Sequence, residues 1–172
     1  MNNDRSFRFG KPVADATYME FGQRKPLHAV YVCSPYRVTD AKNGTPEYDE
    51  KLKANIKRAK CACRLLSMFG YVPVAPHLYF TQFLDDATPE ERELGMLLGA
   101  EMLCKCDELW TFGDKISEGM QSEIAQAKAS GIKVRHFKIP NFFNDVLPNT
   151  ERYSDIVEML ELIVKVQEVL NG

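Results

Sequence analysis

Residues 28–34 read HAVYVCS, a short apolar run with β-branched and aromatic members that ends before Pro35. Such a run is typical of a strand buried on both faces of a parallel sheet. Residues 45–70 follow with an apolar stripe at helical spacing, with Thr45 as the candidate N-cap, Pro46 at the first position and Gly70 as the stop. Residues 71–79, YVPVAPHLY, predict a second strand. Together the three segments predict a βαβ unit.

The alternation of strands and helices continues after this unit. A loop and a helix from about Pro89 precede a strand at residues 107–113, DELWTFG. A helix over 117–131, closed by Gly131, precedes a strand at 132–139, IKVRHFKI. This order predicts an α/β fold, a Rossmann-like (flavodoxin-like) three-layer sandwich with a mainly parallel sheet of four to five strands. We expect residues 28–33 to form an internal strand of that sheet.

The ends of the chain differ from its centre. Residues 1–27 show neither helical nor strand periodicity and predict an N-terminal arm, so the α/β domain is expected at residues 28–172. Residues 154–170, SDIVEMLELIVKVQEVL, predict a last amphipathic helix capped by Ser154. Its apolar surface exceeds what one side of a small sheet hides, which favours a homodimer or higher homo-oligomer.

The composition and net charge limit the kinds of molecule that the protein is expected to bind. The net charge of −2 gives no general attraction to nucleic acid or to an anionic membrane, and no apolar run approaches a membrane span. The first ten residues lack the apolar stretch of a secretory signal, so a cytoplasmic location is expected. Five cysteines, an odd number, predict free thiols. The two C-x-C pairs fall in helical patterns, where their side chains diverge, so neither a metal nor another cofactor is predicted.

Ligands of open α/β sheets bind at the carboxyl ends of the strands. Three segments end strands there: CSPYR at 33–37, APHLYF at 75–80 and GDKISEGM at 113–120. If Ser117 caps the helix that follows, the first-turn N–H groups form an anion site, and Gly119 lets a ligand approach the backbone. This arrangement favours a phosphate. For any one of these segments taken alone, an ordinary loop is the better interpretation.

Glu123 lies in the second turn of this helix, three residues after Met120 and four before Ala127. That spacing places it on an apolar face, where an unpaired carboxylate is costly unless it has a function. The alternative is an exposed helix residue with no role.

These motifs resemble the nucleoside 2-deoxyribosyltransferase-like superfamily, in particular a phage and bacterial branch of uncharacterised domains related to the 2′-deoxynucleoside 5′-phosphate N-hydrolases. The resemblance runs from about residue 28 to 138 and is carried by VYVCSPYR, GYVPVAPH, CDELWTFG and SEGMQSEIAQAKASGIKV. Its strongest element is a Ser or Asp, a Gly two residues later and a Glu six residues later. The resemblance implies cleavage or transfer of an N-glycosidic bond in a small-molecule nucleotide.

The resemblance also implies roles for single residues. Glu123 matches the family's nucleophile, and Ser117 matches the residue that contacts the 5′-phosphate. Arg37 matches an Arg of the first loop, and Tyr31 matches an aromatic residue of the first strand. The remaining candidates for substrate binding are Ser34, His77, Asp114, Gly119 and Met120.

The second carboxylate of the family has no direct counterpart. It stands eight residues before the Asp that opens the third strand, and counting back from Asp107 reaches Gly99. Glu101 and Glu93 lie nearby, and Glu101 is our candidate for the second catalytic group, with Asp114 and His77 as further candidates to protonate the leaving base.

Three other functional classes stay open. A nucleotide sensor or sequestering module of the same fold needs neither Glu123 nor an acid. A phosphoribohydrolase of Rossmann-like type is disfavoured because no PGGxGT loop occurs. A purely structural protein would make the Ser117, Gly119 and Glu123 spacing a coincidence.

Overall fold

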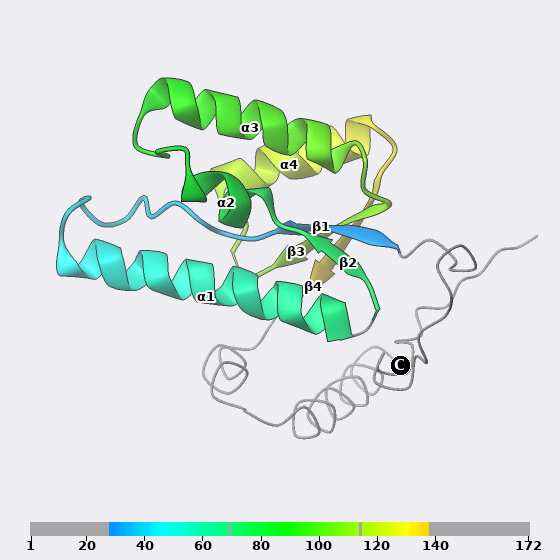
Figure 1. Ribbon diagram of the computed structural model, residues 1–172, viewed down its shortest axis with the longest axis horizontal. Coiled ribbons are helices and arrows are strands. Elements are labelled where there is room, and N and C mark those ends of the chain that lie inside the picture. The colour runs from blue at the N-terminus through cyan, green and yellow to red at the C-terminus, as the bar shows by residue number, and fades with distance from the viewer. Residues whose placement is uncertain (1–27, 69, 114, 138–172) are drawn as a thin grey trace, which may run out of the picture.

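The computed structural model of the chain describes residues 28–68, 70–113 and 115–137, coloured in Figure 1. Its strands are β1 (Ala29–Cys33), β2 (Val72–Val74), β3 (Glu108–Phe112) and β4 (Lys133–Phe137). Its helices are α1 (Pro46–Met68), the short α2 (Pro76–Tyr79), α3 (Pro89–Leu103) and α4 (Glu118–Ala129), and a 3₁₀ turn, η2 (Phe80–Gln82), follows α2.

The four strands form one parallel sheet in the order β2-β1-β3-β4. β1 is therefore internal, with Tyr31 opposite Val74 on one side and Leu109 on the other. Figure 1 shows α1 on one face of the sheet and α3 and α4 on the other. The predicted α/β sandwich with a parallel sheet and residues 28–33 at its centre is confirmed.

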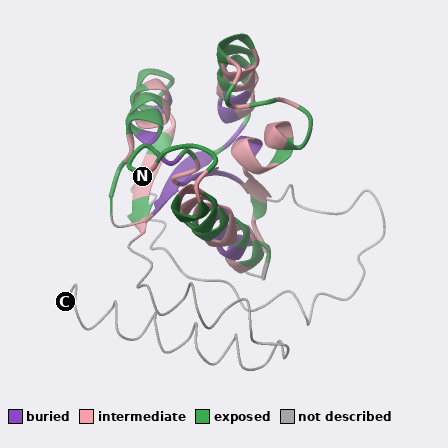
Figure 2. Cartoon of the chain, turned by 90° about the vertical axis from the view of Figure 1, so that its left-hand side faces the viewer, coloured by how far each residue is buried: buried purple, intermediate pink, exposed green. Residues whose placement is uncertain are grey.

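Alternation along β1 divides the core into two clusters, because successive side chains of a strand point to opposite faces. Tyr31 and Cys33 pack with Leu103, Met120 and Ala127 under α3 and α4. The cluster on the α1 face is formed by Val30, Val32, Ala62, Leu66, Trp110 and Phe112. In Figure 2 the buried residues gather on the strands and the exposed residues on the outer sides of the helices.

Local signals in the sequence set most of the element ends. The Thr45 hydroxyl accepts a hydrogen bond from the Tyr48 N–H at 3.3 Å, as an N-cap residue does. Gly70 and Gly131 follow α1 and α4 with φ of 78° and 71°, a region that favours glycine. The predicted stops at both glycines are confirmed.

The predicted strand at 71–79 is too long. It ends at Val74, and Pro76–Tyr79 forms α2 instead. Pro76 has no N–H to donate to a sheet but is suited to the first position of a helix, and it stands at the start of α2. The correction matters because α2 carries His77 at the carboxyl edge of the sheet.

The predicted N-terminal arm at 1–27, the last two residues of the strand predicted at 132–139 and the predicted helix at 154–170 lie outside the described residues. Within the described ranges, no helix combines the length and apolarity needed to cross a membrane.

Candidate functional site

Tyr31 and Glu123 meet at the carboxyl edge of the sheet. The Tyr31 hydroxyl, on β1, donates a hydrogen bond of 2.9 Å to Oε1 of Glu123, on α4. Cys33 follows Tyr31 on the same face of β1, and its thiol lies 3.9 Å from the carbonyl oxygen of Met120. The predicted position of Glu123 between the buried residues Met120 and Ala127 explains why its carboxylate is turned toward the sheet.

The surroundings of Glu123 are largely apolar. Burial raises the pKa of Glu123 above its ordinary value, while hydrogen bonds from Cys33 and Tyr31 act in the opposite direction. Burial and the nearby Glu123 carboxylate raise the pKa values of the Tyr31 hydroxyl and the Cys33 thiol, so both stay protonated. Among the described residues, no Lys, Arg or His forms an ion pair with Glu123. Such a carboxylate is costly for stability, which points to a function.

The N-terminus of α4 lies one turn before Glu123. Ser117 is its N-cap, and its hydroxyl oxygen accepts a hydrogen bond from the Met120 N–H at 3.3 Å. The N–H groups of Glu118 and Gly119 have no partner inside the helix by its geometry. A Cβ built on Gly119 meets nothing within 4 Å, so the approach to this backbone is open. The arrangement suits an anion.

Ser34 and His77 form a second pair at this edge. The Ser34 hydroxyl lies 3.1 Å from Nε2 of His77, which brings together the ends of β1 and β2. The ring of Tyr36 lies 5.9 Å from the ring of His77. Burial lowers the pKa of His77 to about 4, so the imidazole is neutral at neutral pH and carries one N–H donor and one acceptor nitrogen.

Gly99 faces the Tyr31–Glu123 pair from α3. A Cβ built on Gly99 would lie 3.4 Å from the Tyr31 hydroxyl oxygen and 3.5 Å from Cβ of Pro76. Position 99 therefore borders the site, as the resemblance implies for the second carboxylate, but glycine supplies no side chain there.

Glu101 does not join this cluster. It is exposed on α3, and side chains two positions apart on a helix point to nearly opposite sides. Because Gly99 faces Tyr31, Glu101 is directed away from it. The predicted residue Asp114 lies outside the described residues.

A cleft of about 910 Å³ is lined by Tyr36, whose ring lies 5.9 Å from the ring of His77. Ser34 and His77 do not line it. One wall is formed by the loop after β1 and the first turns of α1, and the other by the segment that joins α2 to α3. Arg37, predicted from the resemblance, is exposed and lines this cleft. Ser117 and Glu123 are not among its lining residues. Of the described residues predicted for the site, Arg37 is the one that lines this cleft.

Sequence reasoning did not find Cys33 or the cleft residues Tyr48 and Asp49. The signal for Cys33 was its spacing, since residue i+2 of a strand shares a face with residue i, here Tyr31. The signal for Tyr48 and Asp49 was their place in the first turn of α1, because a helix that follows a parallel strand begins at the carboxyl edge.

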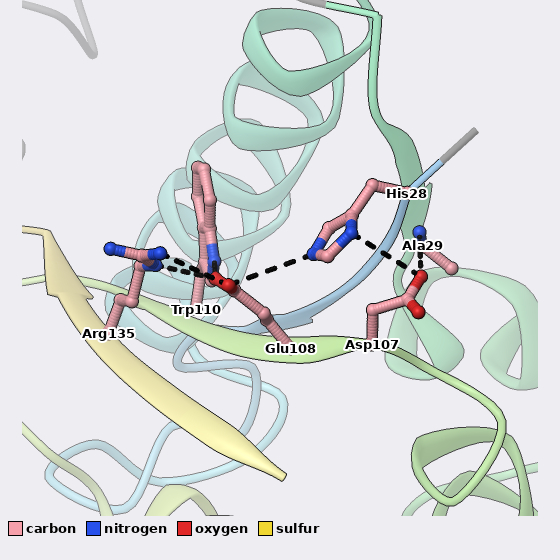
Figure 3. Close-up of polar contacts among 6 residues, drawn as sticks. All are labelled: His28, Ala29, Asp107, Glu108, Trp110 and Arg135. Atoms are coloured by element: carbon pink, nitrogen blue, oxygen red, sulfur yellow. Dashed lines mark hydrogen bonds and ion pairs between the residues drawn. The ribbon is translucent and has the colours of Figure 1, made fainter. Parts of the chain in front are cut away.

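A polar network at the opposite, amino end of the sheet is structural (Figure 3). Glu108 accepts hydrogen bonds from Nε1 of Trp110 at 2.7 Å and from the guanidinium of Arg135, at 3.1 Å for Nη2. Asp107 accepts from the Ala29 N–H at 2.7 Å, and His28 lies 3.7 Å from both carboxylates. These contacts tie β1, β3 and β4 together far from Glu123.

In the part of the chain that the structure describes, no three or more His, Cys, Asp or Glu side chains are grouped to hold a metal ion. All five cysteines are free thiols, as predicted.

Residues 28–137 match a protein family described as "Domain of unknown function (DUF7768)". No curated protein matches the chain. One similar solved structure is a 2-deoxyribosyltransferase from the psychrotolerant bacterium Bacillus psychrosaccharolyticus. That likeness has 18% sequence identity and a TM-score of 0.44, and covers 68% of this chain and 80% of the other.

Proposed function

The chain belongs to the DUF7768 family, whose description assigns no activity, and we propose its function from the site. We propose that the protein cleaves or transfers the N-glycosidic bond of a nucleoside 5′-monophosphate or a related nucleotide. Glu123 is the nucleophile, and the reaction passes through a glycosyl-enzyme intermediate.

The observation that carries the proposal is the 2.9 Å hydrogen bond from Tyr31 to a half-buried Glu123 that has no cationic partner among the described residues. The phenol fixes the direction of one carboxylate oxygen, and we assign the attack to the other. A carboxylate suits this chemistry because it stabilises the positive charge that develops on the sugar and then forms a bond to C1′.

The bonds balance as in a retaining glycosidase. A Glu123 oxygen forms a bond to C1′, the C1′–N bond breaks, and its electron pair leaves with the base. Water, or a second base, then attacks C1′, gives up a proton that neutralises the departed base, and releases the Glu123 carboxylate. His77 is the candidate to hydrogen-bond to the leaving base, because its ring is neutral and held by Ser34. Glu101 has no part in this mechanism, since it is exposed on the other side of α3.

The phosphate is assigned to the N-terminus of α4. The open backbone at Gly119 and the cap residue Ser117 lie one to two turns from Glu123, about the reach of a sugar phosphate along a helix that rises about 1.5 Å per residue. Arg37 is a further candidate contact, since a guanidinium pairs well with phosphate.

The direct test is incubation with a panel of nucleoside 5′-monophosphates, with chromatography for the released base. We expect release from at least one member, loss of release in Glu123→Gln, and weaker use of the corresponding free nucleoside. A Ser117→Ala variant with unchanged affinity for monophosphates would contradict the phosphate assignment.

The second candidate is a nucleotide sensor or sequestering module. It is favoured by one observation, the missing side chain at Gly99 beside the Tyr31 hydroxyl. A wild-type protein that releases no base from any monophosphate, yet is stabilised against heat by one of them, would establish this alternative.

A further inference from the structure

The cleft beside His77 has aromatic walls and an excess of negative charge. Its aromatic lining residues are Tyr36, Tyr48 and Phe83. Four carboxylates, from Asp49, Asp85, Asp86 and Glu91, line it together with one cation, Arg37, among the described residues. This charge disfavours a second phosphate and favours a ring that carries an amino or ammonium group.

Three of the four carboxylates also hold the loop before α3 in place. Asp85 accepts from the Ala87 N–H at 2.9 Å, and Glu91 accepts from the Asp85 N–H at 2.6 Å. Asp86 pairs with Arg92 at 2.8 Å. Asp49 differs, since it is exposed in the first turn of α1 and its carboxylate forms no hydrogen bond or ion pair with the described part of the chain. It is the carboxylate available to a ligand.

Helix α2 connects this cleft to the Tyr31–Glu123 pair. Thr81, in the cleft wall, donates a hydrogen bond of 2.7 Å to the carbonyl oxygen of His77. Pro76, the neighbour of His77, faces Gly99 and, across it, the Tyr31 hydroxyl. A Cβ at Gly99 would lie in ordinary contact with both Pro76 and Tyr31, so the gap there is about the size of a methyl group.

We propose that this cleft receives the leaving group of the reaction, and that the leaving group is an extended base with an amino or ammonium substituent. This inference rests on the proposed function, which puts the glycosidic carbon at Glu123 and the phosphate at α4. A cleft of about 910 Å³ is near the upper end for drug-sized ligands, and a bare nucleobase fills only a small part of such a volume. The substituent reaches the aromatic walls, and its amino group meets Asp49.

The test uses nucleotides that differ only in the base substituent. One series is dUMP, 5-(3-aminoallyl)-dUMP and its N-acetyl derivative; the other is AMP, N6-(6-aminohexyl)-AMP and its N-acetyl derivative. Affinity is measured by calorimetry. We expect the free-amine member of at least one series to bind about tenfold tighter than both its parent and its acetylated form. Equal affinities within both series, or no binding by either, would overturn the inference.

Variants locate the effect in the cleft. Asp49→Asn is expected to remove most of the tenfold gain. Glu50→Gln, one position along the exposed side of α1 and outside the cleft lining, is the matched control and retains the gain. A gain that survives Asp49→Asn unchanged would place the amino group elsewhere and contradict the inference.

The two proposals fail in different ways. If base is released but affinities are equal within each series, the proposed glycosidic cleavage stands and the extended leaving group is rejected. Tight, Asp49-dependent binding of an amine-bearing nucleotide with no base released would support the cleft assignment and reject Glu123 as a nucleophile.

Discussion

The hydroxyl of Tyr31 and the carboxylate of Glu123 are 92 residues apart in sequence and 2.9 Å apart in the structure. The bond joins β1 to α4 next to the cluster of buried side chains that contains Tyr31 and Met120. It fixes the orientation of the carboxylate on which the proposed chemistry depends, so its removal gives a specific prediction.

Tyr31→Phe removes the hydrogen bond but keeps the ring. A hydrogen bond to a charged group contributes about 1.5–3 kcal/mol, so kcat/KM is expected to fall roughly 10- to 100-fold. The acid limb of the pH–rate profile should also move to higher pH, because this bond acts to lower the pKa of Glu123. Tyr71→Phe, on the α1 face of the sheet, is the control and should leave the profile in place. A Tyr31→Phe variant with the wild-type profile would show that the bond does not position a catalytic carboxylate.

Glu123 should make the wild type less stable at neutral pH. Since burial raises its pKa, the folded state holds the proton more tightly than the unfolded chain, and the free energy of unfolding decreases as pH rises above the ordinary Glu value of 4.5. Glu123→Gln is expected to raise Tm at pH 7.5 by about 2 °C or more, with the difference fading below pH 4.5. Glu118→Gln, exposed on the same helix, should have little effect. A lower Tm for Glu123→Gln at pH 7.5 would indicate a structural residue instead.

Glu108 should contribute stability in the opposite pH range. Its burial acts to raise its pKa, but hydrogen bonds from Arg135 and Trp110 outweigh this and lower the pKa below its ordinary value. The stabilisation is therefore present above pH 4.5 and lost as pH falls through the lowered pKa. Glu108→Ala is expected to cost about 3 kcal/mol at pH 7 in denaturant unfolding. A loss of base release without a loss of stability would contradict the assignment of this network to structure.

Many helix and strand ends of this fold can be predicted from residues close to them in the sequence. The helix ends were predictable because the residues that set them need only their own backbone geometry or the adjacent turn. These residues are the N-caps Thr45 and Ser117 and the glycines Gly70 and Gly131. The error at residues 75–79 arose because an apolar run does not distinguish a long strand from a short strand and a proline-initiated turn of helix.

The site was less predictable than the fold. The position of Glu123 followed from its helical spacing to Met120 and Ala127. The pairs Tyr31–Glu123 and Ser34–His77 join residues 92 and 43 positions apart, and such contacts are set by how the elements pack. The exposure of Glu101 depends on how α3 is rotated against the sheet, which its apolar residues do not reveal because they occur on all its sides.

Self-association is expected through α3. Leu94, Met96 and Leu97 are 44%, 51% and 60% exposed there, and Leu94 and Leu97, three positions apart, share one side of the helix. Grouped exposed apolar side chains mark interaction surfaces. We predict that light scattering at micromolar concentration gives twice the 19.6 kDa of one chain or more. Leu97→Glu should shift the protein toward monomer, whereas Ala54→Glu, exposed on α1, should not. A wild-type monomer mass at this concentration would refute the prediction.

The central claim is that Glu123 forms a covalent bond to the sugar. It is tested most directly by intact-protein and peptide mass spectrometry after incubation with 2-deoxy-2-fluoroarabinonucleoside 5′-monophosphates, because fluorine destabilises the cationic transition states and slows breakdown of the ester. The account predicts one fluorosugar phosphate per chain, attached at Glu123 and absent from Glu123→Gln. An unmodified wild-type protein across the whole panel, or an adduct on another residue, would contradict it.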